Sequence, residues 1–184
     1  MAALVAAALA QIGDRTAWLA AILADRYARP GLVIAVAALA IGVAASVAAI
    51  GGIVLAPRMT PEAKQFLLAM ALIVQGGAAL FRSKPPERMS GWTVGAAATS
   101  LVGLAIVVLG DGIQFVVLAI AARSTMPWLA VAGATIGSLA IVVPAALLGE
   151  RAWLALPLRR VRIAIGAAFL AIGLALGIGA IGLV

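Results

Sequence analysis

The stretch Gln11-Ile12-Gly13-Asp14-Arg15-Thr16-Ala17 sets a Gly-Asp pair inside a long apolar run. The stretch Val108-Leu109-Gly110-Asp111-Gly112-Ile113-Gln114 sets a second such pair inside another run, 97 residues later. The same offset relates four further pairs: Arg26 and Arg123, Pro30 and Pro127, Gly52 and Gly149, and Gly76 and Gly173. Aspartate, arginine and proline are rare in this chain, so their matches in one register favour an internal repeat over chance similarity between alanine-rich helices.

The composition around these motifs is typical of a membrane protein. Of the 184 residues, 66% are hydrophobic and only 10% are charged, and the mean hydropathy is +1.24. A soluble domain has about 45–50% apolar and about 25% charged residues, so the composition disfavours a soluble globular fold, a disordered chain and a nucleic-acid-binding module. The net charge of +7 then indicates basic loops that face anionic lipid on one side of a bilayer.

Six segments are apolar enough to cross a bilayer as helices, each of which needs about 20 residues. The sequence therefore predicts an all-α membrane protein with six transmembrane helices. The expected spans are 2–24, 31–56, 62–82, 93–122, 127–148 and 160–183. We expect residues 2–24 to be a retained span rather than a signal peptide, because no basic segment precedes the apolar run.

The charges of the loops predict the orientation of the chain. The second and fourth loops carry three basic residues, whereas the first, third and fifth loops carry nine: Arg26, Arg29, Arg82, Lys84, Arg88, Arg151, Arg159, Arg160 and Arg162. Basic loops stay in the cytoplasm. Both termini of a chain with six spans are therefore expected outside the cytoplasm.

The repeat divides this single transmembrane domain, residues 1–184, into one repeat of residues 1–88 and a second of residues 89–184. Each repeat holds three spans, an odd number, so the second repeat is inserted upside down relative to the first. Inverted repeats are typical of secondary transporters, whose substrate sites lie near the bilayer midplane where the repeats meet.

The same register places Asp14 and Asp111 near that midplane. Each lies twelve residues before an arginine, Arg26 or Arg123, which is ~18 Å along a helix. An ionised aspartate in the membrane interior costs at least ~2.5–3.5 kcal/mol on insertion scales, so both residues are candidates for function. The chain has no cysteine and no histidine, which leaves oxygen ligands. Such ligands suit hard divalent cations such as Ca²⁺, Mg²⁺ or Mn²⁺.

Other polar side chains near the two aspartates are candidates for the same site. Gln11 precedes Asp14 by three residues and Gln114 follows Asp111 by three, so each amide shares a helix face with a carboxylate. We expect a metal site formed by Asp14, Asp111, Gln11, Gln114 and Thr16, lined also by Gly13, Arg15 and Gly110. Two alternatives stay open: Thr16 bonds to its own helix, or Arg15 forms a structural ion pair with one or both aspartates.

The first motif resembles the E-φ-G-D-[KR]-[TS]-Q motif of bacterial manganese exporters and their Golgi manganese/calcium relatives. These are cation/proton exchangers of the calcium/cation antiporter superfamily. The second motif aligns at 108–114, and the resemblance covers nearly the whole chain, including Ala24 to Pro30 and the run LLGERAWLALPLRRVR at 147–162. It implies six spans in inverted halves, a bacterial inner-membrane location, and exchange of Mn²⁺ or Ca²⁺ for protons.

The chain departs from the motif of that family at five positions, where it has Gln11, Ala17, Val108, Gly112 and Ile113. The resemblance implies that the family's motif glutamates and aspartates together bind the cation and exchange protons. Gln11 and Val108 replace the two glutamates, so only Asp14 and Asp111 remain for that role. The departures imply weaker divalent affinity, a different ion, or lost transport.

Two other functions are compatible with the sequence. A small-solute exporter of the lysine-exporter type would have a wide polar cavity, and a non-transporting membrane subunit would have a closed interface between the repeats. We expect no enzyme, because the G-x-G-D motif of intramembrane aspartyl proteases needs glycine at position 11 or 108. We expect no cofactor other than the transported cation. The expected partners are the lipid bilayer, cations and protons, with no nucleic acid, and a homo-oligomer remains open.

Overall fold

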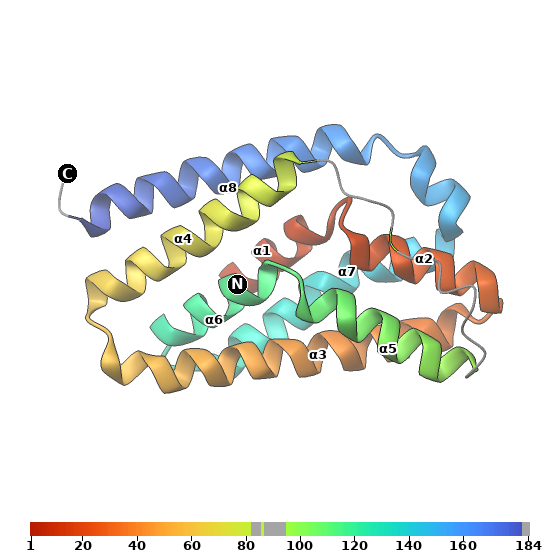
Figure 1. Cartoon of the computed structure of the whole chain (residues 1–184), viewed down its shortest axis with the longest axis horizontal. Coiled ribbons are helices and arrows are strands. Elements are labelled where there is room, and N and C mark those ends of the chain that lie inside the picture. The colour runs from red at the N-terminus through yellow and green to blue at the C-terminus, as the bar shows by residue number, and fades with distance from the viewer. Residues whose placement is uncertain (82–85, 87–94, 182–184) are drawn as a thin grey trace.

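The computed structural model describes residues 1–81, 86 and 95–181, and this part of the chain is helical with no strand. The helices in chain order are α1 Ala2–Gln11, α2 Arg15–Tyr27, α3 Pro30–Leu55, α4 Pro61–Leu80, α5 Ala96–Leu109, α6 Ile113–Arg123, α7 Pro127–Ala155 and α8 Leu158–Ala180, with a 3-10 turn η1 at Ala56–Arg58. Most of them lie along the long axis of the molecule (Figure 1). The all-helical fold class is confirmed.

Four of the expected spans appear as single elements: 31–56 as α3, 62–82 as α4, 127–148 as α7 and 160–183 as α8. Proline occupies the first turn of α3, α4 and α7, where a missing N–H breaks no helical hydrogen bond. Helix α7 continues beyond residue 148, but Gly149 has φ 75° and ψ 173°, so a kink separates its last residues from the apolar segment.

The expected continuous span at 2–24 is wrong, because the chain breaks there into α1 and α2. Gly13 has φ +72°, a left-handed conformation that glycine adopts readily and other residues rarely do. The Asp14 side chain then accepts a hydrogen bond from the Thr16 backbone N–H and caps α2. A cap of this kind favours the start of a new helix over continuation of the old one.

The expected span at 93–122 is also broken, into α5 and α6, which are bent by 64° relative to each other. The break falls at Gly110, Asp111 and Gly112, and the Asp111 side chain accepts a hydrogen bond from the Ile113 N–H at the start of α6. Residues 93 and 94 lie outside the described residues. Both Gly-Asp motifs therefore end one helix and begin another.

Within the described ranges, four helices are long and apolar enough to cross a membrane: α3, α4, α7 and α8. The bent pair of α5 and α6 makes a fifth span if it is taken as one, and α1 is a shorter apolar helix. The structure thus contains four or five helical spans by this measure, and it does not show six continuous ones.

Each broken pair of helices lies along a long helix from the other half of the chain. Helices α1 and α2 pack on α7, whereas α5 and α6 pack on α3, and α3 and α7 pack on each other. Helices α4 and α8 run side by side over a long distance at one edge of the molecule (Figure 1). This arrangement brings the two helix breaks into the middle of the bundle.

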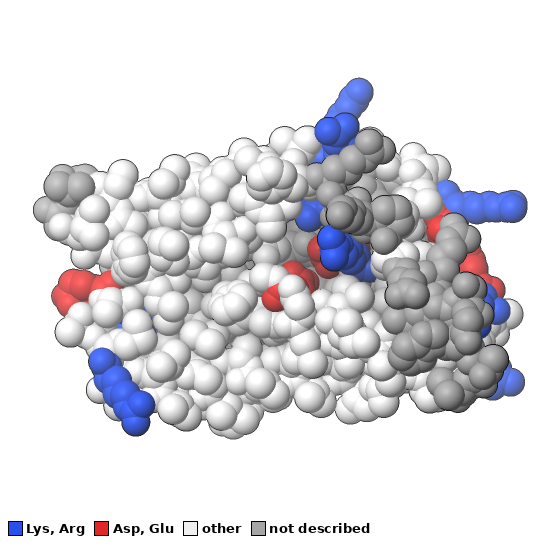
Figure 2. Space-filling model, viewed as in Figure 1, with Lys and Arg blue, Asp and Glu red and all other residues white. Residues whose placement is uncertain are grey.

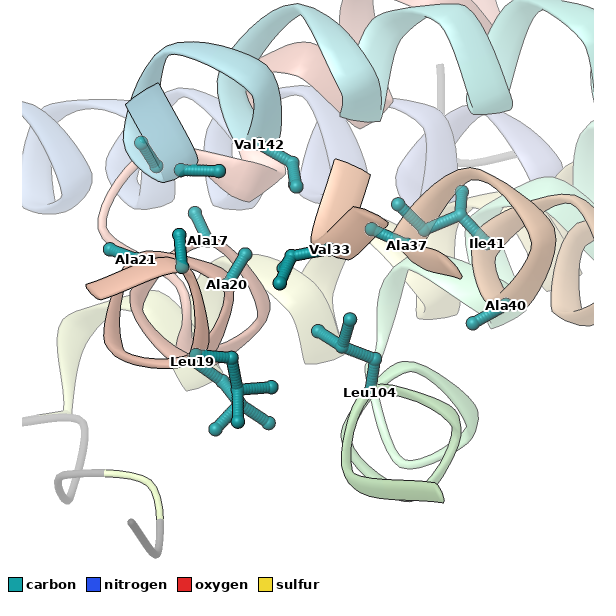
Figure 3. Packing of buried hydrophobic residues seen from close by; sticks show 14 of the residues in the cluster. Ala17, Leu19, Ala20, Ala21, Val33, Ala37, Ala40, Ile41, Leu104 and Val142 are labelled. Atoms are coloured by element: carbon teal, nitrogen blue, oxygen red, sulfur yellow. The ribbon is translucent and has the colours of Figure 1, made fainter. Parts of the chain in front are cut away.

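Small side chains allow this close packing. One core cluster joins α2, α3, α5 and α7, and most of its members are alanine. Figure 3 shows Ala20 of α2, Val33 of α3 and Leu104 of α5 turned toward the same space. Interfaces rich in small residues are typical of helices that associate in lipid, because their backbones can approach closely.

The turns between consecutive helices are divided between the two ends of the molecule. The turns from α2 to α3 and from α7 to α8 lie at one end, together with the start of α5 (Figure 1). The turns from α3 to α4 and from α6 to α7 lie at the opposite end, with the end of α8. Three of the nine basic residues assigned to loops, Arg82, Lys84 and Arg88, lie outside the described residues.

Candidate functional site

A cavity of about 490 Å³ lies where the two helix breaks meet, and its wall contains both Asp14 and Asp111. The other lining residues are Arg15, Gln75, Ala78, Phe81, Ile106, Val107, Gly110, Gly112 and Arg162. In the space-filling view, acidic and basic atoms meet in a hollow about midway along the molecule (Figure 2). Both aspartates that the sequence assigns to one site thus line the same cavity.

Each aspartate is held by the first turn of the helix that follows it. Asp14 Oδ2 accepts a hydrogen bond from the Thr16 N–H at 3.1 Å, and Asp111 Oδ1 accepts one from the Ile113 N–H at 3.2 Å. Thr16 and Ile113 are themselves 97 residues apart. The unpaired N–H groups and the dipole of a helix N-terminus stabilise a carboxylate, so both halves hold their charge in the same way.

Gln11, Gln114 and Thr16 do not line the cavity. Gln11 is 1% exposed and donates from Nε2 to Asp111 Oδ2 at 3.4 Å, so it contacts the site through that aspartate. Gln114 donates from Nε2 to the Val108 carbonyl at 3.4 Å. The single oxygen atom of each of these three side chains is buried and has no hydrogen-bond partner among the residues described. These atoms are Gln11 Oε1, Gln114 Oε1 and Thr16 Oγ1.

Unsatisfied buried oxygens of this kind are uncommon in folded proteins and each costs about 1–3 kcal/mol. A hydroxyl or amide oxygen without a partner is available to a cation or to a water molecule that accompanies one. The three oxygens are of the chemical kind that hard divalent cations prefer, and they lie behind the two carboxylates rather than in the cavity wall.

The expected lining residues Gly13, Gly110 and Arg15 have different roles. The Gly13 carbonyl is exposed by the helix break and accepts a hydrogen bond from Arg162 Nη1 at 3.5 Å. Gly110 caps the end of α5 and lines the cavity. Arg15 is exposed at the same cavity and forms no ion pair with either aspartate within the described residues. The structure therefore shows no structural ion pair through Arg15.

Arg162 is a residue of the site that sequence reasoning missed. Its assignment to a loop is wrong, because it lies in the second turn of α8 and lines the cavity beside the two aspartates. Its guanidinium donates to the carbonyls of Gly13 and Ala78, the latter at 3.2 Å. The signal available in the sequence was its place inside the segment 160–183, which the apolar pattern had already predicted to be a span.

Gln75 of α4 is the second residue that was missed. It is 7% exposed and lines the cavity. Its Oε1 occupies the space that a Cβ at position 112 would need. A side chain at position 112 would therefore have to displace the Gln75 amide, and with Gly112 no side chain follows Asp111 into the cavity as Arg15 follows Asp14.

A second cavity of about 330 Å³ adjoins the first, since Asp14, Phe81 and Arg162 line both. Its remaining wall comes from α2, α4, the end of α7 and the start of α8, and includes Trp18, Trp153 and Arg159. It extends toward the end of the molecule where α7 turns into α8. Asp14 is thus accessible from two directions.

Two carboxylates, those of Asp14 and Asp111, line the cavity. In the ranges 1–81, 86 and 95–181, no three or more histidine, cysteine, aspartate or glutamate side chains are grouped so that they could hold a metal ion. Two carboxylates supply a charge of −2, and carbonyl, amide and hydroxyl oxygens can complete a coordination shell for a hard cation. This arrangement can bind a divalent cation, or protons in its place, and it contains no nucleophile beside a base.

Comparison with known proteins agrees with this geometry. A family model described as "Divalent cation/proton antiporter GDT1" matches residues 1–87 and 96–182. A protein of Vibrio cholerae serotype O1 named "Putative manganese exporter" is 31% identical over 170 residues, which cover 91% of this chain and 84% of that protein. No solved structure matches. Because the family match spans nearly the whole chain, including both Gly-Asp motifs, the chain belongs to the GDT1 family of divalent cation/proton antiporters.

Proposed function

We propose that this protein exports a divalent cation, Mn²⁺ or Ca²⁺, across a membrane in exchange for protons, with Asp14 and Asp111 as the shared cation ligands. The observation that carries this proposal is the single cavity that both carboxylates line. Membership of an antiporter family supports the transport of divalent cations by this chain. Membership of a family of transporters also supports the expectation that the chain is not an enzyme.

The exchange follows from the chemistry of the two carboxylates. A carboxylate must lose its proton before it binds a metal ion, so metal binding and proton binding compete at the same oxygens. When the cavity faces the side with less acid, the aspartates bind the cation. When it faces the more acidic side, protons replace the cation and return across the membrane. Gln11, Gln114 and Thr16 supply neutral oxygens behind the aspartates, and these keep their ligand capacity at any pH.

We further propose that residues 1–88 and 89–184 are inverted repeats. The start of α3 at Pro30 and of α7 at Pro127 differ by 97, as do the starts of α4 at Pro61 and of α8 at Leu158. The hydrogen bonds to Asp14 and Asp111 have the same offset. In this proposal the broken helices α1–α2 and α5–α6 each count as one crossing, which gives six crossings in all.

The distribution of basic residues supports an orientation. Arg26 and Arg29 flank the turn from α2 to α3, and Arg159 and Arg160 follow the turn from α7 to α8, at the same end of the molecule (Figure 1). Of the basic residues in the described part of the chain, three lie near the opposite turns: Arg58, Lys64 and Arg123. The basic end belongs in the cytoplasm by the positive-inside rule, so we propose an inner-membrane protein with both termini outside.

The alternative of a non-transporting subunit requires a closed interface between the halves. The cavity lined by Asp14 and Asp111 disfavours this alternative, because it leaves both carboxylates accessible. A transporter of small polar solutes would be expected to surround them with more than the one neutral amide, Gln75, that lines the cavity.

Ion flux into proteoliposomes tests the proposed function. Purified protein is reconstituted, and uptake of Mn²⁺ and of Ca²⁺ is measured separately, each with and without a pH gradient. The expected result is saturable uptake of at least one of the two ions, accelerated by a gradient that drives protons in the opposite direction. Flux equal to that of empty liposomes under every condition would overturn the proposal.

A further inference from the structure

Arg162 and Asp14 are the two charged residues that line both cavities. The Arg162 guanidinium is anchored on two backbone carbonyls, Gly13 at 3.5 Å and Ala78 at 3.2 Å. It makes no hydrogen bond to a carboxylate of the described chain, yet it lines the same cavity as Asp14 and Asp111. The fixed positive charge therefore stands beside the cation site without occupying a carboxylate oxygen.

The residue 97 positions earlier shows that this charge is not required for helix packing. Gln65 on α4 donates from Nε2 to the Leu176 carbonyl on α8 at 3.0 Å. Arg162 on α8 makes a similar bond in the other direction, to the Ala78 carbonyl on α4, which is one residue from the position that the 97-residue offset pairs with Leu176. A neutral amide thus forms a similar bridge between these helices in one half of the chain, so the positive charge at 162 needs a separate explanation.

The charges around the two cavities define what Arg162 can do. Asp14, Arg15, Asp111, Arg159 and Arg162 are the charged groups in their walls, and α4, α5 and α7 contribute none among the residues described. Arg15 and Arg159 are exposed, and no hydrogen bond within the described residues fixes either guanidinium beside the cavities. Arg162 is half-buried and anchored, so its charge acts more strongly on a cation in the cavity.

We propose that Arg162 is a tethered counter-charge of the cation site, an inference that rests on the function proposed above. With the site empty, the guanidinium balances one of the two carboxylate charges and leaves a net charge of −1. With a divalent cation bound, the three groups and the cation together carry +1, and the repulsion between the guanidinium and the cation favours release. Arg162 therefore lowers the affinity of the site and speeds the turnover of the transporter. It is a positioning residue, since it acts on the cation through charge and not as a ligand.

Three variants separate the charge from the hydrogen bond. Arg162→Gln removes the charge and supplies an amide donor of the kind with which Gln65 bridges α4 and α8. Arg162→Lys keeps the positive charge. Arg160→Gln is the matched control, because it removes an arginine from the same helix that lines neither cavity. Mn²⁺ binding is measured by calorimetry on the full chain in detergent. Mn²⁺ uptake is measured in proteoliposomes, with Arg162→Met as a second charge-free variant if the first does not fold.

The charge-free variant is expected to bind Mn²⁺ tighter by on the order of tenfold, with a lower half-saturating concentration and a lower maximal rate of uptake. Arg162→Lys is expected to stay close to the wild type in both measurements, as is Arg160→Gln. Detectable binding in Arg162→Gln where the wild type binds too weakly to measure would also support the inference.

Equal or weaker binding in folded Arg162→Gln, beside measurable binding in the wild type, would overturn the inference and leave the proposed function standing. A loss of charge dependence, in which Arg162→Lys behaves as Arg162→Gln does, would overturn it as well. If neither the wild type nor any variant binds or takes up Mn²⁺, the inference is overturned. If the wild type also takes up no Ca²⁺, the proposed function is overturned as well.

Discussion

Gly76 on α4 and Gly173 on α8 lie 97 positions apart, and each one is in contact with the backbone of the other's helix. A Cβ on Gly76 would lie 2.6 Å from the Gly166 carbonyl oxygen and 2.8 Å from the Leu170 nitrogen. A Cβ on Gly173 would lie 2.9 Å from the Ala69 carbonyl oxygen and 3.0 Å from the Ile73 nitrogen. The contacted residues are also 97 positions apart, since Ala69 pairs with Gly166 and Ile73 with Leu170. The two helices therefore meet through a reciprocal contact that only glycine permits.

This contact predicts that neither glycine tolerates a side chain. Gly76→Ala and Gly173→Ala are each expected to destabilise the protein by about 1–3 kcal/mol, because the added methyl group forces the helix backbones apart. Gly77→Ala is the matched control, since a Cβ there meets no atom within 4 Å. Thermal unfolding in detergent, followed by the fluorescence of the four tryptophans, measures the effect. A melting temperature of Gly76→Ala equal to that of the control would contradict the close contact.

The shared cavity predicts that Asp14→Asn and Asp111→Asn each abolish divalent-cation uptake by proteoliposomes. Asparagine removes the charge that balances a dehydrated cation, yet its side-chain oxygen still accepts the hydrogen bond from the start of the next helix. Both variants should therefore fold. Asp25→Asn is the control, because Asp25 lines neither cavity. Uptake that persists in both cavity variants would show that the aspartates are structural.

The contact between Gln11 and Asp111 predicts the effect of an added carboxylate. Gln11→Glu places a third acid beside Asp111 Oδ2 and is expected to tighten Mn²⁺ binding by on the order of tenfold, since affinity rises with ligand charge. The binding should also depend more steeply on pH, because each added carboxylate must lose a proton first. Calorimetry across a pH series measures both effects, with Gln65→Glu as a control that adds an acid elsewhere.

Val108→Glu, which adds the corresponding acid to the second motif, is expected to behave differently. Val108 is 1% exposed and belongs to the apolar core, so a carboxylate there is buried without a partner. We expect this variant to lose expression and thermal stability rather than to gain Mn²⁺ affinity. A well-folded Val108→Glu protein with tighter Mn²⁺ binding would contradict this placement.

The kink in α7 predicts a third glycine that tolerates no side chain. Gly149 has φ 75° and ψ 173° and lies against the carboxylate of Asp25, which accepts a hydrogen bond from the Glu150 N–H at 2.7 Å. Gly149→Ala is expected to cost about 1–3 kcal/mol, because this backbone conformation is nearly exclusive to glycine. Gly31→Ala, where a Cβ meets nothing within 4 Å, should leave the melting temperature in detergent almost unchanged.

The proposed orientation predicts which turns an impermeant thiol reagent reaches in intact cells. The chain has no cysteine, so Met126→Cys and Leu156→Cys each introduce a unique thiol at an exposed turn at opposite ends of the molecule. Labelling from outside should reach position 126 and miss position 156, and permeabilised cells should show both. The reverse pattern in intact cells would overturn the orientation.

The sequence by itself determined the helical class, the starts of the long helices to within two residues and the presence of both aspartates at one cavity. Apolar runs of about 20 residues have no stable alternative to helices in lipid, since every backbone polar group must be satisfied within the chain. Prolines at positions 30, 61 and 127 mark helix starts because proline has no N–H to donate. Equal offsets of Asp14 and Asp111 within two similar halves were enough to predict that both residues belong to one site.

Only the tertiary structure decided the content of the site around those carboxylates. The sequence shows that Arg162 and Gln75 are polar residues near or within apolar segments, but not which neighbouring helix each one contacts. Arg162 reaches the cavity because α8 packs along α4 and brings the carbonyls of Gly13 and Ala78 within hydrogen-bond distance. Gln11, three residues from Asp14, instead contacts Asp111. Such contacts depend on the packing of residues far apart in the chain, which periodicity and spacing along one helix do not specify.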